Sequence, residues 1–247
     1  LLAVVSLSFL IGWGAVRIAP AVPFEWEPDI SLAPSGYSSE EDQRIADYLK
    51  NLTHGLIPRG AEISDIKVHW LPDMDAANAF ATSGGNIHVT RGLLDAVNSE
   101  NGLAMVLAHE IAHAKNRDPL SGTSRGILLQ ILISSVRSNS GIDPRGSAET
   151  GLELLLNDYS REQEEAADRL ALIGLQKRYG HAGGATRLFE ALSAVYGDSE
   201  VPEILSSHPH VGDRIAAINA LIAEKGWESR ATVPHPAEVQ DALSSRP

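Results

Sequence analysis

Residues 103–113 read LAMVLAHEIAH and contain an H-E-x-x-H pattern, His109-Glu110-Ile111-Ala112-His113. The apolar residues around the pattern recur at helical spacing, which predicts a mostly buried helix. Two histidines four positions apart lie on one face of a helix, so their imidazoles can bind one cation together. Zinc is the natural ion for such a pair, and a catalytic zinc site uses three protein ligands and leaves one position to water. Glu110 lies beside that position and can serve as a general base.

A second acidic pattern, SREQEEAAD at residues 160–168, can supply the third ligand from another helix. Glu162, Glu164 and Glu165 all remain candidates on the residues alone. Asp168 follows Glu164 by four positions and therefore shares its helical face. From there Asp168 can accept a hydrogen bond from a ligand imidazole and fix its orientation.

The rest of the chain predicts an α+β fold that is mainly α-helical. We expect a small sheet, consisting of a hairpin and an edge strand, packed on the helix that carries the H-E-x-x-H pattern. The hairpin strands are 78–82 and 86–90 around the turn at 83–85, and a further strand covers 63–70. Helices are expected from residue 39 to about 55, near 93–97, from about 100, and over 126–136, 151–179, 184–197 and 210–224.

The chain divides into four parts. Residues 1–16 carry no charge, and the segment 1–19 predicts a membrane anchor or a signal segment, which makes the membrane a partner. A proline-rich linker covers 20–36, the catalytic domain 37–225, and a loose polar tail 226–247. Arg17 is the one basic residue near the apolar segment and acidic residues follow it. We therefore expect the domain on the extracytoplasmic, periplasmic face of a cell envelope.

Composition excludes several classes of protein. The 247 residues are 43% hydrophobic and 21% charged, which is typical of a globular chain. With 32 Asp and Glu against 20 Lys and Arg, the net charge of -12 repels phosphate backbones, so no nucleic acid is expected as a partner. The chain has no cysteine, which excludes thiolate zinc sites, cysteine nucleophiles and disulfide scaffolds.

Four ordered motifs resemble one known family over roughly residues 40–222. They are Asn78-Ala79-Phe80-Ala81 with Gly85-x-Ile87-x-Val89-x-x-Gly92-Leu93-Leu94, the H-E-x-x-H pattern, Ser160-Arg161-x-x-Glu164-x-x-Ala167-Asp168, and Ser207-His208-Pro209 with Arg214-Ile215. Together they resemble the HtpX-like zinc metallopeptidases, M48-type gluzincins that include BepA-, LoiP- and Oma-type enzymes and the CAAX prenyl proteases. The resemblance implies a zincin fold with one Zn²⁺ per chain bound by His109, His113 and Glu164. It also implies Glu110 as catalytic base and Asp168 as a support behind the ligands.

These residues predict a zinc-dependent metalloendopeptidase that acts on unfolded or misfolded envelope proteins. The oxyanion of the reaction needs a further partner, for which His208 ranks before Tyr159 and Arg214. In a resting state His208 can instead be a self-inhibiting fourth ligand, and a helix-capping role is the structural alternative.

The strand Asn78, Ala79, Phe80 and Ala81 can pair with an extended substrate, or be a plain core hairpin. The alternative function is a zinc-bearing, self-latched, chaperone-like binding module with little proteolysis, and a purely structural zinc site is a third.

Overall fold

A computed structural model describes residues 26, 27, 29, 31, 32, 34, 36–57, 66–119, 159–196, 208 and 211–244. The apolar segment 1–19 and the helix expected at 126–136 lie outside these residues. Among the helices that are described, none has the length and apolar character needed to cross a bilayer.

The sheet has three strands, β1 (Lys67–Leu71), β2 (Ala79–Thr82) and β3 (Asn86–Thr90). Their order is β1-β3-β2, with β1 parallel and β2 antiparallel to the central β3. The expected hairpin is confirmed, and its turn contains Gly84 and Gly85 at φ +82° and +75°. Residues with a Cβ rarely adopt such angles, so the two glycines allow the chain to reverse tightly.

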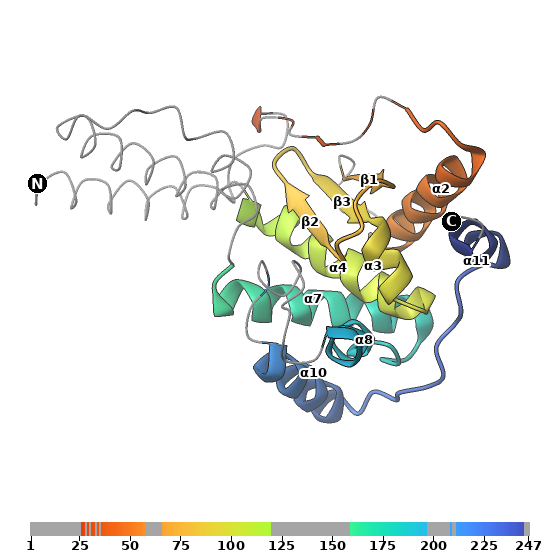
Figure 1. The fold of residues 1–247 in the computed structure, drawn as a ribbon. Helices are drawn as coiled ribbons and strands as arrows, with labels where there is room; N and C mark the ends of the chain where they lie inside the picture. The colour runs from red at the N-terminus through yellow and green to blue at the C-terminus, as the bar shows by residue number, and fades with distance from the viewer. Residues whose placement is uncertain are drawn as a thin grey trace, which may run out of the picture.

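Helix α4 (Glu100–Asn116) carries the H-E-x-x-H pattern through the middle of the molecule. The Ser99 hydroxyl accepts a hydrogen bond from the Gly102 amide and so caps its start. Every residue from Asn101 to Ala114 is buried, because the sheet covers one side of α4 and helix α7 the other (Figure 1). This enclosure explains why apolar residues surround the motif on all sides.

Helix α7 (Arg161–Tyr179) begins with a capping box formed by Ser160 and Gln163 and ends at Gly180. It runs antiparallel to α4, since its first turn lies beside His113 and its last residue, Tyr179, donates a hydrogen bond to Glu100. The two helices approach closely at Gly174, where an added Cβ would lie 3.6 Å from the Cβ of Ala108. The face of α7 that bears Glu164 and Asp168 is therefore held against α4.

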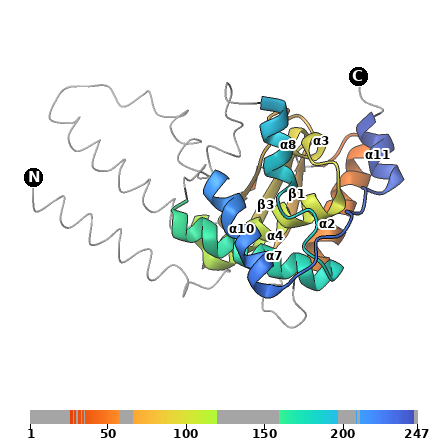
Figure 2. The ribbon, with the colours of Figure 1, turned by 90° about the horizontal axis from the view of Figure 1, so that it is seen from below.

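The remaining helices surround this pair. They are α2 (Glu40–Leu56), α3 (Arg91–Ala96), α8 (Arg187–Tyr196), α10 (Val211–Lys225) and α11 (Ala237–Ser244). Helix α10 packs on α7 and α11 packs on α2, which the view from below shows clearly (Figure 2). A mainly helical molecule with a three-stranded sheet confirms the expected α+β class.

The end of the described chain differs from the loose tail that the sequence predicts. Helix α11 buries Val239 and Ala242, and the ring of His235 lies 2.6 Å from the Val97 carbonyl and 3.0 Å from the Tyr48 hydroxyl. The Val233 amide donates to the Asn101 side chain at 2.7 Å. Polar composition suggested a solvated segment, but His235, Val239 and Ala242 are buried against the domain, while Val233 is 44% exposed.

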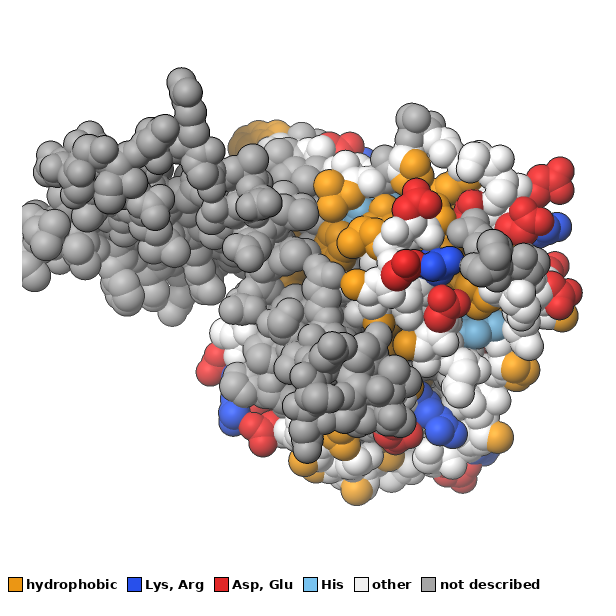
Figure 3. All heavy atoms as spheres, viewed as in Figure 1, with side chains coloured by type: hydrophobic (Ala, Val, Ile, Leu, Met, Phe, Trp, Pro, Cys, Tyr) orange, Lys and Arg blue, Asp and Glu red, His pale blue; other side chains and the backbone are white. Residues whose placement is uncertain are grey.

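The described linker residues also contact the domain instead of standing free of it. Asp29 bonds Lys67 and Asn86 at the sheet, and the Leu32 amide donates to the ring of His88. On the face drawn in Figure 3, acidic side chains are scattered over the described surface, in keeping with the net charge of -12.

Candidate metal centre

Four side chains converge at the interface of α4 and α7, and one ligand atom from each lies within 4.8 Å of all the others. They are His109, His113, Glu164 and His208, and all four are buried. The two Nε2 atoms of His109 and His113 are 2.9 Å apart. Glu164 Oε1 lies 3.4 Å from His113 Nε2 and 2.9 Å from His208 Nδ1. These are the groups of the described chain that can hold a metal ion.

The spacing of these atoms fits zinc. Zinc–nitrogen bonds of about 2.0–2.1 Å place the corners of a tetrahedron about 3.3–3.4 Å apart. His109 Nε2 lies 3.3 Å from His208 Nδ1 and 3.4 Å from Glu164 Oε2. Nitrogen and carboxylate oxygen donors without sulfur are also the donor set that zinc hydrolases use. The donor types and these two distances are compatible with a zinc ion, whereas the 2.9 Å between the Nε2 atoms of His109 and His113 is shorter than such an edge.

The structure separates the three glutamates that the sequence left open. Glu164 is buried with 1% exposure, whereas Glu162 and Glu165 are exposed. A helix turns by about 100° per residue, so neighbours in sequence cannot share the face that meets α4. Of the three glutamates, only Glu164 contacts the imidazoles of His109 and His113.

A carboxylate stands behind each imidazole of the H-E-x-x-H pattern. Asp168 Oδ1 lies 2.9 Å from His109 Nδ1, and Asp118 Oδ2 lies 2.8 Å from His113 Nδ1. Gln163 donates to the other oxygen of Asp118 at 2.6 Å. Such partners fix which ring nitrogen is free and where it points. Sequence reasoning missed Asp118, although its position five residues after the second histidine was a usable signal.

Arg214, on α10, neutralises the carboxylates of α7. Its guanidinium donates to both oxygens of Asp168, at 2.8 and 2.7 Å, and Nη1 lies 2.7 Å from Glu164 Oε2. The sequence placed Arg214 among the oxyanion candidates, but its donors face these carboxylates. Burial alone would raise the pKa of Asp168, whereas hydrogen bonds from Arg214 and His109 lower it to about 2.

The same contacts set the charge of the ligands. Burial acts to raise the pKa of Glu164, but hydrogen bonds from His109, His113 and His208 hold it far below its usual range. Burial and Arg214 lower the pKa of His109, while Asp168 and Glu164 raise it to a net value of about 9. These contacts keep Glu164 ionised and favour the protonated form of His109.

Glu110 lies at the rim of the cluster and is 1% exposed. Its Oε1 is 3.5 Å from His208 Nε2, and its Oε2 has no hydrogen-bond partner within the described part of the chain. Burial raises its pKa, although His208 and His109 oppose the change. A buried carboxylate with a free oxygen beside a metal centre is suited to accept a proton from water.

His208 and Tyr159, the other two oxyanion candidates, both lie at the centre. His208 is 2% exposed and is one of the four residues that could hold a metal ion, while the ring of Tyr159 stacks on His113 with ring centres 3.9 Å apart. Burial lowers the pKa of His208, which keeps the ring neutral and able to donate a lone pair to a metal.

The expected substrate strand lies beside α4, outside the ligand cluster. Strand β2 forms one edge of the three described strands, and its residues Ala79, Phe80 and Ala81 are buried. Asn78 precedes it, and both polar atoms of the Asn78 side chain are buried without a partner among the described residues.

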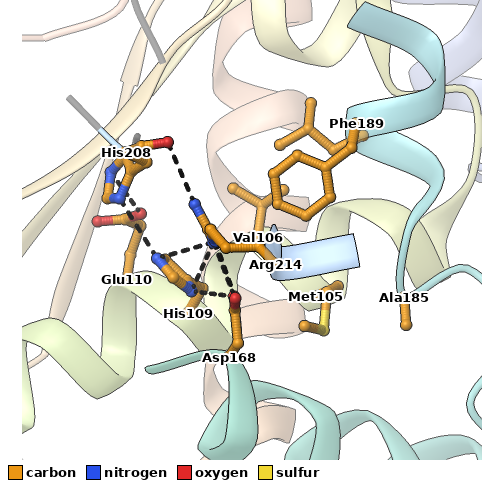
Figure 4. Close-up of a pocket in the computed structure, with 10 residues that line it drawn as sticks. Met105, Val106, His109, Glu110, Asp168, Ala185, Phe189, His208 and Arg214 are labelled. Atoms are coloured by element: carbon orange, nitrogen blue, oxygen red, sulfur yellow. Dashed lines mark hydrogen bonds and ion pairs between the residues drawn. The ribbon is translucent and has the colours of Figure 1, made fainter. Parts of the chain in front are cut away.

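A pocket extends from the cluster to a group of apolar side chains. Its lining combines the polar groups His109, Glu110, Asp168, His208 and Arg214 with the apolar residues Met105, Val106, Ala185, Leu188 and Phe189. Figure 4 shows the two linings on different sides, with Arg214 between them. The Arg214 guanidinium lies 4.8 Å from the ring centre of Phe189, so it separates the ionic and apolar parts.

Comparison with known proteins agrees with this geometry. The model of the family described as Peptidase family M48 matches residues 43–222. The mitochondrial metalloendopeptidase OMA1 of Bos taurus is 29% identical over 203 residues, 75% of this chain and 39% of the relative. The beta-barrel assembly-enhancing protease of Escherichia coli K12 is 27% identical over 188 residues, 71% of this chain and 38% of the relative. The chain thus spans about two fifths of the length of these relatives.

Proposed function

The chain belongs to peptidase family M48, and from this premise we propose that it is a zinc-dependent endopeptidase acting on extended protein segments. The observation that carries the proposal is the buried Glu110 carboxylate, with one unpaired oxygen, beside four converging ligand atoms. Burying a carboxylate oxygen without a partner costs free energy of folding. In a purely structural metal site nothing would offset this cost, whereas a catalytic site needs the free oxygen.

The metal ligands in this proposal are His109, His113 and Glu164. Asp168 and Asp118 hold the two histidines, and Arg214 holds Glu164. When bound, zinc acts as a Lewis acid that polarises the scissile carbonyl and makes a nearby water more acidic. One ion per chain follows from the single cluster found among the described residues.

Proton transfer belongs to Glu110. Its free oxygen accepts the proton of the attacking water as the water oxygen bonds to the peptide carbon. The same carboxyl then gives the proton to the leaving nitrogen as the carbon–nitrogen bond breaks. Because burial raises its pKa, Glu110 is a stronger base than an exposed glutamate, which favours proton uptake from the attacking water.

His208 must leave the ligand set for the substrate carbonyl to enter. Its ring lies 2.9 Å from Glu164 and 3.3 Å from His109, which supports a resting state in which His208 blocks the fourth position. In its present position the ring also lies 3.5 Å from Glu110, which supports a second role in which a displaced His208 donates a hydrogen bond to the oxyanion. The same contacts favour the second candidate, a self-latched binding module with little turnover.

The pocket beside the centre supports a preference for an apolar substrate side chain. Phe189, Leu188 and Val106 line its apolar side, next to the reacting groups. Strand β2 lies at an edge of the described sheet, and this position supports pairing with an extended substrate. Unfolded proteins offer both features, and we propose them as the substrate class.

Location is proposed from the apolar segment 1–19 and from the relatives. One relative is named for enhancing beta-barrel assembly and another is mitochondrial, which supports action on proteins of a membrane-bounded envelope. We propose membrane attachment through the N-terminal segment, with a periplasmic or equivalent extracytoplasmic catalytic domain at about residues 37–225.

The test is hydrolysis of casein by the full chain, with and without a chelator, beside Glu110→Gln. Cleavage that stops with the chelator, returns with Zn²⁺ and falls at least about 100-fold in the variant is the expected result. Glu162→Gln, which removes an exposed acid from α7, is the matched control and should cleave normally. If zinc-loaded wild type leaves casein intact while Glu110→Gln still binds it, the binding-module candidate replaces the enzyme.

A further inference from the structure

Glu27, a residue of the proline-rich linker, makes a buried ion pair with the end of the active-site helix. Its Oε1 lies 2.5 Å from Nε of Arg117, and the two side chains are 3% and 9% exposed. Its other oxygen accepts a hydrogen bond from the Gly84 amide in the hairpin turn at 2.9 Å. One linker carboxylate therefore ties the sheet to the C-terminal end of α4.

Arg117 is the C-cap of α4 and has an unusual backbone. Its φ of 61° places it in the left-handed region. Among the described residues, all others with a positive φ are glycines. This conformation is unfavourable for residues with a Cβ and persists where contacts hold it. Three contacts do so: the Arg117 amide and guanidinium both donate to the Ala114 carbonyl, and Glu27 forms an ion pair with the guanidinium.

The turn at Arg117 determines where the next residue points. Asp118 follows directly, and its carboxylate lies 2.8 Å from Nδ1 of His113. A change in the backbone of Arg117 would swing Asp118 away from the ring, because the two residues share one peptide unit. The His113 ring would then lose the partner that holds Nε2 toward the ligand cluster.

We propose that Glu27 is a positioning residue for the metal ligand His113, acting through Arg117 and Asp118. The inference rests on the proposed function only in taking His113 as a zinc ligand. It makes the linker part of the metal centre, so that the segment joining the apolar N-terminus to the domain also sets zinc affinity.

A second linker acid provides the matched control. Asp29 bonds Lys67 and Asn86 on β1 and β3, and its side chain is 60% exposed. Neither partner belongs to α4 or to the turn that follows it. Asp29→Asn thus loosens the linker at the sheet without touching the route to His113.

The experiment measures the Zn²⁺ dissociation constant of the full chain by competition with a chromogenic chelator. We expect Glu27→Gln to weaken zinc binding about 10-fold, the lower end of the effect of outer partners of metal ligands. Asp29→Asn should leave the constant unchanged. Glu27→Asp, which keeps the charge on a shorter arm, should fall between wild type and Glu27→Gln.

Coupling to Asp118 is tested by a double-mutant cycle. Asp118→Asn should weaken zinc binding by itself, and Glu27→Gln should then add no further loss, since both act through one contact. Additive losses, or an equal loss with Asp29→Asn, would contradict the proposal. So would an unchanged constant in Glu27→Gln.

Metal-free samples of each variant are compared by circular dichroism to separate folding from metal binding. If Glu27→Gln does not fold, Glu27→Asp, alone and combined with Asp118→Asn, decides the matter. A wild type that binds no zinc would instead overturn the proposed function, so the two failures are distinguishable. The absorption spectrum of the Co²⁺-substituted chain adds a readout of ligand geometry, and it should change in Glu27→Gln but not in Asp29→Asn.

Discussion

His88, on the central strand, should make the stability of the protein depend on pH. The ring is fully buried between Phe80 and His69. The centres of these two rings lie 4.9 and 5.1 Å, respectively, from the centre of the His88 ring. Its Nε2 accepts a hydrogen bond from the Leu32 amide at 3.0 Å, which requires the neutral ring. Burial first, and then the neighbouring His69, lower its pKa from 6.5 to about 4.

The direction in which pH changes the free energy of unfolding follows from proton linkage. A histidine with a lower pKa in the folded state binds its proton more tightly when the chain is unfolded, so protonation favours unfolding. The stabilising contribution is complete above pH 6.5 and is lost as the pH falls toward 4. With about 1.36 kcal/mol per pKa unit, the loss is about 2 kcal/mol at pH 5 and about 3 kcal/mol at pH 4.

The assay compares urea unfolding of wild type and His88→Gln from pH 7 to pH 4, both metal-free. Glutamine cannot titrate but can still accept from the Leu32 amide, so the difference between the two curves isolates the His88 proton. His54→Gln, at an exposed site on α2, controls for loss of an imidazole. If the free energies of unfolding of wild type and His88→Gln stay parallel over this range, the reasoning is refuted.

Three further changes test the packing around the centre. Ser160→Ala removes the capping box of α7 and should lower the free energy of unfolding by about 1 kcal/mol in urea titrations; no change would contradict the capping role. Arg214→Gln leaves Asp168 and Glu164 without their buried counter-charge, and metal-free protein should lose about 3–5 kcal/mol; a loss below 1 kcal/mol would mean that solvent reaches the pair. Phe189→Ala enlarges the apolar side of the pocket and should reduce kcat/KM roughly 10-fold for peptides with a large apolar side chain relative to alanine; equal losses would place that side chain elsewhere.

Much of the fold follows from local patterns. The hairpin with Gly84 and Gly85 and the buried helix of the H-E-x-x-H motif came from turn and period signals. The helical pattern expected over 151–179 ends as expected at Tyr179, but the described helix α7 begins only at Arg161, after the Ser160 cap. Expected strand 63–70 is described as β1 from Lys67, and helix ends differ by a few residues. Boundaries shift because caps and tertiary contacts decide the last turns.

Other features depend on contacts between distant parts of the chain. The docking of α11 on α2, and of Glu27 on Arg117, joins segments that carry no local sign of their partners. The expectation of a loose tail was wrong because a polar segment with a few well-placed apolar residues can still pack.

The candidate site was partly readable in the sequence. The histidine pair follows from helical spacing alone, but Glu164 was chosen over its neighbours through family resemblance, and burial in the structure agrees with that choice. The pairing of Arg214 with Asp168 joins residues 46 positions apart, which spacing rules cannot reach.

Zinc content and casein hydrolysis, measured together on wild type, Glu110→Gln and Glu164→Gln, test whether Glu164 binds the metal and Glu110 transfers the proton. We predict one zinc per chain with activity in wild type, one zinc without activity in Glu110→Gln, and loss of both in Glu164→Gln. Retained hydrolysis in zinc-loaded Glu110→Gln would contradict the assignment of proton transfer to this carboxylate. Full zinc content in Glu164→Gln would contradict the ligand set.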